Sequence, residues 1–481
     1  MEQQQESPFR ESRYAFSARH QGDRREGSRP GLRGRLAEAM LRAIVAVSPN
    51  SEQALRVATG FISQSLSTAR FYCGLDPVDY YRDYFAWRPA FRSLRQGLTI
   101  EIDAQRRGAR AAVFGRAGQS AHYRELLGSV TVRAPAPPAP ALPATGRPAP
   151  RATGALVTGN AEPDHPLAAI LARAVRPPAP GRRAATKALV VVRDGRLIGE
   201  AYAPGYGSAT PIIGYSLAKT LANAVAGRMA HRALLAPDER ELFAEWRGAG
   251  DARRQISIGH LLQMTSGLDI AETHSGYDPV SRMLFLSADM GGFAARAELG
   301  GVPGRRFSYT SGNTMLFARL VRDRLGTGAQ GVWSFLDGEL FAPLGMERML
   351  VEFDLSGSPI LSTFCYASAR DWARLGLLYL DDGCVAGARL LPEGWVGYST
   401  TGGAEPSYGA GLRLSRRGGQ GEKWLLPGLP PGTFYAHGHL GQYVVVIPER
   451  RMVIVRLGTS SAAMRRHDRA LLAEIAAAAA C

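Results

Sequence analysis

The sequence predicts an α+β protein built around one antiparallel sheet, and three observations lead to that fold class. A β-hairpin pattern opens the region at 188–202, where two apolar runs flank an Asp194-Gly195 turn. A second hairpin pattern lies near its end, at 443–457. Between the hairpins the periodicity is mainly helical, and a last helix is expected over 462–479. Strands from both ends of the region indicate one antiparallel sheet, packed by terminal helices and carrying a helical insertion, rather than repeated βαβ units.

The chain before this region divides by composition into three segments. Residues 1–35 are polar and rich in Arg, Ser and Gln, which predicts a disordered basic tail. Residues 36–133 have a globular composition and are expected to form a small N-terminal α/β extension. Residues 134–186 are rich in proline, which fits neither helices nor central strands, so we expect an extended connector there. The main domain is accordingly placed at 187–481.

Periodicity predicts individual elements within these segments. Apolar residues at helical spacing predict a helix over 52–67, and two β-rich runs predict strands at 98–102 and 110–114. A short helix is expected near 164–175, inside the connector. In the main domain, apolar residues at every fourth position over 217–229 predict a further helix.

Composition excludes several classes of protein. With 45% hydrophobic residues among 481, the chain can bury a large core, so a wholly disordered or fibrous protein is excluded. The net charge of +16 is spread along the chain without a long basic run, and we expect no nucleic-acid partner. The four cysteines lie far apart and form no CxxC pair, which argues against a zinc cluster and against a disulfide scaffold.

No segment has the character of a membrane span or of an ordinary signal peptide. No stretch reaches the roughly 18 uninterrupted apolar residues that a membrane-spanning helix requires. The apolar stretch at 36–47 is too short, is interrupted by Glu38 and Arg42, and lacks a convincing cleavage site. These features favour a cytoplasmic location. The sequence carries no signal for an oligomeric state.

The use of lysine singles out one residue. The chain has only three lysines, Lys187, Lys219 and Lys423, against 55 arginines. Arginine stays protonated, whereas a buried lysine can lose its proton and act as a base. A lysine kept in such a chain marks a position where arginine cannot replace it, and Lys219 is the candidate.

Lys219 stands three residues after Ser216, at the start of the predicted helix. This spacing puts both side chains on one face of the helix, within reach of each other. A serine hydroxyl becomes a nucleophile when a neighbour takes its proton, and a desolvated lysine near the positive end of a helix can do so. A chain of this composition would contain only ~0.2 Ser-x-x-Lys matches by chance. Taken alone, the motif is equally compatible with a capping serine and an exposed lysine.

Four further motifs follow, at 256–268, 303–313, 366–379 and 435–442. With them the sequence resembles the serine hydrolases of the class C β-lactamase and DD-peptidase superfamily, and most nearly their branch of esterases and 6-aminohexanoate-dimer hydrolases. The likeness is nearly continuous from about 187 to 460, and 55–132 looks like the N-terminal extension of some of these hydrolases. It implies a β-lactamase/transpeptidase-like fold, with an antiparallel sheet flanked by terminal helices plus a helical insertion domain.

The resemblance implies roles for four residues of the first motifs. Ser216 would be the acylated nucleophile and Lys219 its proton partner. Tyr309, in the family's Tyr-x-Ser/Asn element, would shuttle a proton between Ser216 and the leaving group. Asn313 would belong to the substrate-binding side of the site, either in contact with the lysine or as a residue that shapes the loop.

The motif at 435–442 stands where penicillin-recognising enzymes carry their third conserved motif. We call it the third motif, and it departs from the pattern of those enzymes. Where β-lactamases carry Lys-Thr-Gly, this chain reads Ala436-His437-Gly438, so we expect β-lactamase activity to be weak or absent. Gly438 would allow a close backbone approach, and the N–H of His439 would pair with that of Ser216 as an oxyanion hole. His437 and His439 could instead bind zinc, but two histidines without a carboxylate or cysteine in a motif favour residues that line the pocket.

We therefore expect a serine hydrolase that cleaves a small carboxylic ester or linear amide through an acyl-enzyme, with no metal and no cofactor. Two alternatives remain at this point. An α/β-hydrolase could use Ser216 in a GxSxA elbow with Asp371 and His437 as partners, or the fold could serve as a non-catalytic binding module. The specificity loops, at about 269–300 and 401–432, carry no readable code for the substrate.

Overall fold

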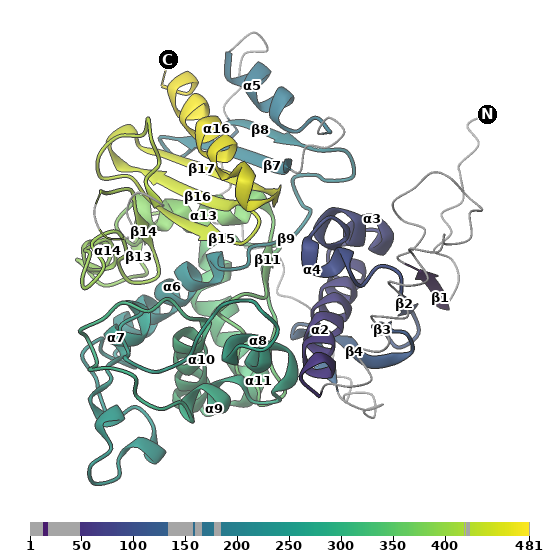
Figure 1. Cartoon of the computed structure of the whole chain (residues 1–481). Coiled ribbons are helices and arrows are strands. Elements are labelled where there is room, and N and C mark those ends of the chain that lie inside the picture. The colour runs from purple at the N-terminus through teal and green to yellow at the C-terminus, as the bar shows by residue number, and fades with distance from the viewer. Residues whose placement is uncertain are drawn as a thin grey trace, which may run out of the picture. The chain divides into compact units, whose positions relative to one another are not determined.

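The computed structural model describes residues 13–17, 49–132, 157–158, 166–177, 184–417, 419 and 424–480. The chain falls into two compact units, which are taken separately below (Figure 1). The first unit spans 1–145 together with 272–288, and the second spans 146–271 together with 289–481. The segment 272–288, which the sequence analysis placed in the main domain, thus belongs to the first unit. Most of the predicted tail and connector lies outside the described residues.

The first unit contains a five-stranded antiparallel sheet in which the strands follow one another in chain order. They are β1 Arg13–Ser17, β2 Leu98–Asp103, β3 Gly108–Val113, β4 Arg116–Arg124 and β5 Gly128–Val132. The first strand is a correction, because the predicted tail was expected to have no structure. β1 pairs with β2 over five residues, and such pairing uses backbone groups, which leave little signal in side-chain periodicity.

Helix α2, Pro49–Phe71, packs on β3, β4 and β5 of this sheet. Two of its buried threonines are hydrogen-bonded to the sheet. Thr59 donates to the Ala117 carbonyl at 2.7 Å, and Thr68 donates to the Ser129 hydroxyl at 2.7 Å. Buried polar groups that find partners cost little and fix the register of the helix on the sheet.

Helix α8, Pro279–Leu286, lies in the inserted segment 272–288 and packs against α2. The Phe61 and Phe285 rings are 5.2 Å apart, and a Cβ on Gly60 would touch the Phe285 side chain. The remaining helices of this unit are α3 Pro77–Tyr81 and α4 Pro89–Arg92.

The second unit is built on a seven-stranded sheet that is antiparallel except at one edge, where β6 runs parallel to β8. Its strands, in spatial order, are β14 Arg413–Leu414, β15 Phe434–Gly438, β16 Gln442–Ile447, β17 Met452–Ser460, β7 Ala184–Arg193, β8 Arg196–Tyr202 and β6 Val157–Thr158. The N-terminal pair β7–β8 and the C-terminal pair β16–β17 meet in the centre through β7 and β17. This arrangement confirms the predicted α+β class and the sheet shared between the two ends.

Alternate residues of the central strands face different helices. Val445 and Ile454 belong to a core that includes α5, Pro166–Ala174, and α16, Arg465–Ala478. Val444 and Val453 face α13, Ala369–Leu380, where a Cβ on Gly376 would lie only 2.6 Å from Val453. The sheet is therefore covered on both faces, and the terminal helices lie on one of them (Figure 1).

The rest of the second unit is mainly helical. Its helices are α6 Leu217–His231, α7 Ile258–Leu262, α9 Met290–Ala295, α10 Ser311–Leu325, α11 Gly328–Leu336, α12 Ala342–Leu344 and α14 Trp395–Ser399. Two small sheets accompany them, one of β9 Ile212–Ile213, β10 Leu350–Val351 and β11 Cys365–Ala367, and one of β12 Cys384–Val385 and β13 Ala388–Arg389. No helix among the described residues is long and apolar enough to cross a membrane.

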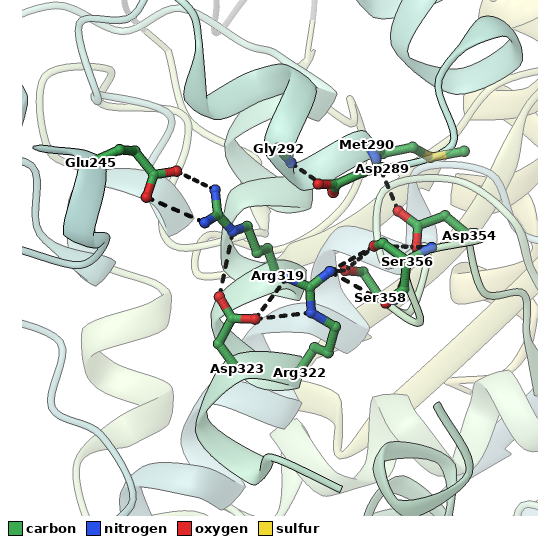
Figure 2. Close-up of polar contacts among 10 residues, drawn as sticks. All are labelled: Glu245, Asp289, Met290, Gly292, Arg319, Arg322, Asp323, Asp354, Ser356 and Ser358. Atoms are coloured by element: carbon green, nitrogen blue, oxygen red, sulfur yellow. Dashed lines mark hydrogen bonds and ion pairs between the residues drawn. The ribbon is translucent and has the colours of Figure 1, made fainter. Parts of the chain in front are cut away.

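Two arginines anchor the C-terminal half of α10 (Figure 2). Arg319 bonds to Glu245, and Arg322 donates to the Ser356 hydroxyl at 2.6 Å. The Ser356 hydroxyl in turn donates a hydrogen bond to the buried carboxylate of Asp354 at 2.7 Å. A second oxygen of Asp354 accepts the first backbone N–H of α9, from Met290, at 2.9 Å. The network ties α9 and α10 to the loop after β10, and α10 supplies a residue of the candidate site from its first turn.

Candidate active site

A short loop carries Ser216 from strand β9 into helix α6. β9 pairs with β11, and the N–H of Gly214 donates to the Cys365 carbonyl at 2.8 Å, which extends that pairing by one residue. Tyr215 then adopts a left-handed conformation, with φ of +48°, and Ser216 is the N-cap of α6. A non-glycine residue in this conformation is strained, and such strain persists where the surrounding structure enforces it.

The ring of Trp372, on α13, packs directly under this loop. A Cβ on Gly214 would lie 2.4 Å from the Trp372 ring, so only glycine fits there. Trp372 itself is fully buried. The tryptophan therefore acts as a support for the serine loop.

Lys219 lies one turn along α6 and is 2% exposed. Its ammonium group donates to the hydroxyls of Ser216, at 3.2 Å, and Ser311, at 3.1 Å. A third hydrogen bond goes to the Ser362 carbonyl at 3.0 Å. The three N–H groups of an ammonium are thus all matched. No carboxylate in the described part of the chain comes within ion-pair distance of Lys219.

Tyr309 faces the same ammonium group from the loop before α10. The Lys219 nitrogen lies 4.9 Å from the centre of the Tyr309 ring, a cation–π distance. Two residues later, Ser311 begins α10 and supplies the second hydroxyl at Lys219. The structure therefore brings Ser216, Lys219 and Tyr309 together. Ser311 was not among the expected site residues, although the Tyr-x-Ser spacing of the motif contained the signal.

Of the two places expected for Asn313, the structure shows the one without contact to Lys219. Its side chain is 1% exposed, and its carbonyl oxygen accepts a hydrogen bond from the Ser266 hydroxyl at 2.7 Å. Its amide points to the sulfur of Met264, at 3.9 Å. Asn313 thus joins the first turn of α10 to the loop after α7, and it does not contact Lys219. It shapes the site from behind and offers no surface to a substrate.

Strand β15 runs against the serine loop at Gly438. A Cβ on Gly438 would lie 2.0 Å from the Gly214 carbonyl, so the two backbones meet where only glycine fits. The chain then turns sharply through His439, Leu440 and Gly441, the last two with φ of +60° and +82°. Gly438 therefore brings β15 into contact with the loop that carries Ser216, directly before His439.

The β15–β16 turn is held from behind by buried polar groups. The amide of Gln442 donates to the carbonyls of His439, at 2.9 Å, and of Gly458, at 2.6 Å. Arg456, on β17, donates to the Gly441 carbonyl at 2.6 Å and pairs with Asp468 of α16 at 3.1 Å. Burial raises the pKa of Asp468, and the Arg456 charge opposes that shift. The turn that follows Gly438 is therefore braced by β17 and α16.

His437 and His439 lie on either side of Gly438. The His437 ring is only partly exposed and stands 4.7 Å from the Tyr443 ring, on the sheet face that α16 covers. Burial lowers the pKa of His437 well below its ordinary value, and the positive charge of Arg413 is the next largest cause. His439 makes an edge contact with Tyr215 at 5.4 Å. Within the described residues no group of three or more His, Cys, Asp or Glu side chains could hold a metal ion.

The geometry does not support a nucleophile elbow. Such an elbow needs a parallel sheet and a histidine at the serine, whereas the main sheet here is antiparallel apart from β6 and the partner of Ser216 is Lys219. Asp371, the acid that this alternative requires, accepts the backbone N–H of Arg348 at 2.8 Å and pairs with Arg374 at 3.0 Å.

Comparisons with known proteins show the family of this chain. The Beta-lactamase family profile matches residues 171–478. A 6-aminohexanoate-dimer hydrolase of Paenarthrobacter ureafaciens is 26% identical over 317 residues, which cover 62% of this chain and 80% of that protein.

Solved structures give a similar picture of the fold. A Bacillus anthracis protein provisionally named a 6-aminohexanoate-dimer hydrolase aligns with a TM-score of 0.50 and 22% identity, over 61% of this chain and 79% of its own. A family VIII carboxylesterase aligns with a TM-score of 0.45 and 14% identity, over 61% of this chain and 92% of its own. The first likeness supports a β-lactamase/transpeptidase-like fold.

Proposed function

Because this chain belongs to the Beta-lactamase family, we propose that it is a serine hydrolase that cleaves a carboxylic ester or a linear amide through an acyl-enzyme. The observation that carries the proposal is the hydrogen bond between buried Lys219 and Ser216, at 3.2 Å. The names of the relatives, a 6-aminohexanoate-dimer hydrolase and a carboxylesterase, support these two substrate classes.

Ser216 would attack the carbonyl carbon of the substrate. To accept its hydroxyl proton, the pair formed by Lys219 and Tyr309 must hold one proton fewer than an ammonium group and a phenol together; the pair takes the proton from Ser216, and Tyr309 then delivers a proton to the departing alcohol or amine. Water later attacks the acyl-enzyme, and the same groups work in reverse. Tyr309 comes from the loop before α10 and lies against Lys219 of α6, which supports a shared role of the two residues.

The negative charge that develops on the carbonyl oxygen would be held by two backbone amides. One is that of Ser216, at the positive end of α6, and the other is that of His439. The contact of Gly438 with the Gly214 carbonyl supports this assignment, since it holds the two loops together. The third motif lacks the lysine of β-lactamases, so hydrolysis of a penicillin or of nitrocefin should be weak or absent.

The first test measures covalent labelling and turnover. Wild type should react with a serine-directed phosphonate and hydrolyse p-nitrophenyl butyrate or the 6-aminohexanoate linear dimer, and Ser216→Ala and Lys219→Ala should lose both activities. Ser334→Ala, at an exposed serine of α11, and Lys187→Ala, at a buried lysine 5.1 Å from the Tyr206 ring, are the matched controls. Undiminished labelling of Ser216→Ala would overturn the nucleophile. Absence of labelling and turnover in the wild type would favour a binding module.

A second comparison tests the role of Tyr309. Tyr309→Phe keeps the ring beside Lys219 but removes the hydroxyl that protonates the leaving group. The variant should lose about 10²- to 10⁴-fold in kcat on an amide or alkyl ester, and less on a p-nitrophenyl ester, whose leaving group departs without a proton. Tyr408→Phe is the control, because it removes a hydroxyl from a neighbouring buried tyrosine and keeps the ring that packs 5.9 Å from Tyr309. Equal losses on both substrates would argue against the proton shuttle.

A further inference from the structure

The ring of Tyr309 has two close neighbours in the second unit. The Lys219 nitrogen lies 4.9 Å from its centre, and the Tyr408 ring meets it at 5.9 Å with an interplanar angle of 89°. Tyr408 is 3% exposed, whereas Tyr309 keeps part of its surface exposed. A buried ring in edge contact with another restricts where that second ring can lie. The position of Tyr309 against Lys219 therefore depends on what holds Tyr408.

Tyr408 opens a tight turn of the chain. The N–H of Gly409 donates to the Leu412 carbonyl at 2.9 Å, and Tyr408 and Arg413 form an antiparallel β-bridge. We call residues 408–413 the Tyr408 turn. Gly411 lies within it with φ of +76°, a left-handed conformation that favours glycine.

Gly411 fastens the Tyr408 turn to two helices. Its carbonyl accepts a hydrogen bond from the Thr220 hydroxyl of α6 at 2.7 Å. Its N–H donates to the carbonyl of Leu262, the last residue of α7, at 3.1 Å. A Cβ on Gly411 would lie only 2.5 Å from the Lys219 carbonyl. The Tyr408 turn is therefore in direct contact with the helical turn that carries Lys219.

Thr220 makes this link with its side chain. It follows Lys219 directly in the chain and is 3% exposed. A hydroxyl has one proton to donate, and that of Thr220 goes to the Gly411 carbonyl. The contacts close a circuit that runs from Lys219 to the Tyr309 ring, on to the Tyr408 ring, and back through Gly411 to Thr220. A hydrogen bond in such a circuit sets both a distance and an angle.

We propose that Thr220 is a positioning residue for Tyr309. Through Gly411 and the ring of Tyr408, its hydroxyl holds the Tyr309 phenol where a proton can reach the leaving group. This inference rests on the proposed function, because it concerns the proton shuttle assigned to Tyr309. Thr220 itself takes no part in bond breaking. Its loss should therefore harm substrates whose leaving group needs a proton, and spare those whose leaving group does not.

Two butyrate esters with the same acyl group test this inference. p-Nitrophenyl butyrate releases a phenolate that departs without a proton, whereas ethyl butyrate releases an alcohol that must be protonated. The measured quantity is kcat/KM for the first ester divided by kcat/KM for the second, which we call the ester ratio. Thr220→Val keeps the shape of the side chain without its hydroxyl. It should raise the ester ratio about 10-fold or more, since a misplacement of about 1 Å can cost about 10²-fold.

Further variants show that the effect follows the proposed circuit. Thr220→Ser keeps the hydroxyl and should return the ester ratio most of the way to that of the wild type. Tyr408→Leu removes the ring beside Tyr309 and should raise the ester ratio as Thr220→Val does.

Thr59→Val is the matched control. Thr59, on α2 of the first unit, is also a buried threonine that donates to a carbonyl distant in the chain, that of Ala117, at 2.7 Å. Its ester ratio should equal that of the wild type. A loss of folded protein lowers kcat/KM for both esters by the same factor, so it leaves the ester ratio unchanged. The ratio therefore separates a positioning role from a merely structural one.

Tyr309→Phe separates this inference from the proposed function. If Tyr309→Phe does not raise the ester ratio, the proposed proton shuttle fails and the inference fails with it. If Tyr309→Phe raises the ratio but Thr220→Val lowers both esters equally, or changes neither, the shuttle stands and the inference is wrong. A higher ratio in Thr220→Val that returns in Thr220→Ser supports the inference.

Discussion

A guanidinium group could not replace the ammonium group of Lys219. The ammonium reaches two hydroxyls and one carbonyl, contributed by Ser216, Ser311 and Ser362, which surround one nitrogen atom. A planar guanidinium group spreads its donors over three nitrogens and would need a wider space than this buried position provides. The geometry gives a physical reason for a lysine here in a chain with 55 arginines.

His437 should make stability depend on pH below about 6.5, the ordinary pKa of histidine. The folded state lowers the pKa of His437. Between the folded and the unfolded pKa the unfolded chain therefore binds the extra proton, so stability falls as pH falls. Urea unfolding at pH 7.5, 6.5 and 5.5 should show the wild type losing up to about 1.4 kcal/mol per pH unit more than His437→Gln. Besides burial, four cationic or titratable neighbours depress this pKa, namely Arg413, Arg465, His439 and Arg469.

The difference between the two proteins is the informative quantity. Other groups titrate in the same range, among them His260, whose pKa burial also lowers. They act equally in wild type and variant, and they cancel in the comparison. Two parallel stability curves would mean that His437 is protonated as readily in the folded as in the unfolded protein.

Spacing in the sequence predicted that Lys219 lies beside Ser216, and the resemblance to a known family added Tyr309, which lies against Lys219. It could not predict the carbonyl of Ser362, because a backbone acceptor has no residue type. For a related reason, the sequence left two places open for Asn313. An asparagine in a motif can face either the pocket or the core, and here the hydroxyl of Ser266 directs it to the core.

At the scale of elements, the candidate site depends on how closely β15 approaches the loop between β9 and α6. The two backbones meet at Gly438 and Gly214, and the turn after Gly438 is braced by Gln442 and Arg456. Neither side of the proposed oxyanion hole can therefore move without displacing a buried hydrogen bond.

Gly438→Ala should damage catalysis more than stability. The new methyl group would lie 2.0 Å from the Gly214 carbonyl, so the two amides of the proposed oxyanion hole must separate. We expect a loss of about 10²- to 10³-fold in kcat, comparable with the loss of one oxyanion donor, and about 1–3 kcal/mol in stability from overpacking. Steady-state kinetics and urea unfolding measure the two effects.

Gly397→Ala provides the control for that experiment. Gly397 lies in α14, and a Cβ there would meet open space. This variant should match the wild type in kcat and be more stable by up to about 1 kcal/mol, because alanine favours a helix over glycine. Wild-type kcat in Gly438→Ala would show that the approach of β15 to the loop is not needed for catalysis.

The long elements could be predicted from the sequence, and the shortest could not. Both hairpins of the main sheet and helices α2, α5, α6 and α16 follow from periodicity over many residues. Strands β9 and β11, which position the serine loop, contain two and three residues. An alternation of apolar and polar residues needs at least four positions to be recognised. The elements closest to the proposed chemistry are thus the ones that periodicity misses.

At the scale of the whole molecule, the chain of the second unit is interrupted once by a segment that belongs to the first unit. The segment 272–288 leaves the second unit and packs its helix α8 on α2 of the first. The sequence analysis treated the N-terminal extension as separate in the chain from the main domain. Local patterns cannot reveal this exchange, because α8 has the same apolar periodicity whichever core it joins.

Removal of residues 1–145 should leave α8 without its partner. Phe285 would lose its contact with Phe61 and become exposed, together with other apolar side chains of α8 that are buried in the full chain. We expect the 146–481 chain to aggregate, as measured by size-exclusion chromatography with light scattering. An exposed apolar face of this kind promotes association.

A second truncated chain separates this cause from a general loss of stability. Truncation combined with Met283→Gln and Phe285→Gln should be more soluble than truncation alone, although the same substitutions should destabilise the full chain. A truncated chain that stays monodisperse without substitutions would show that α8 does not need α2.

The left-handed backbone of Tyr215 has a consequence for the evolution of this protein. Holding a tyrosine in that conformation costs roughly 1–3 kcal/mol, which the fold must recover elsewhere. Substitutions that relax it would be favoured by selection for thermal robustness and opposed by selection for turnover, because they would release Ser216 from its place at the start of α6. In related proteins that keep the fold but no longer hydrolyse a substrate, Tyr215 should therefore be among the first positions to be substituted.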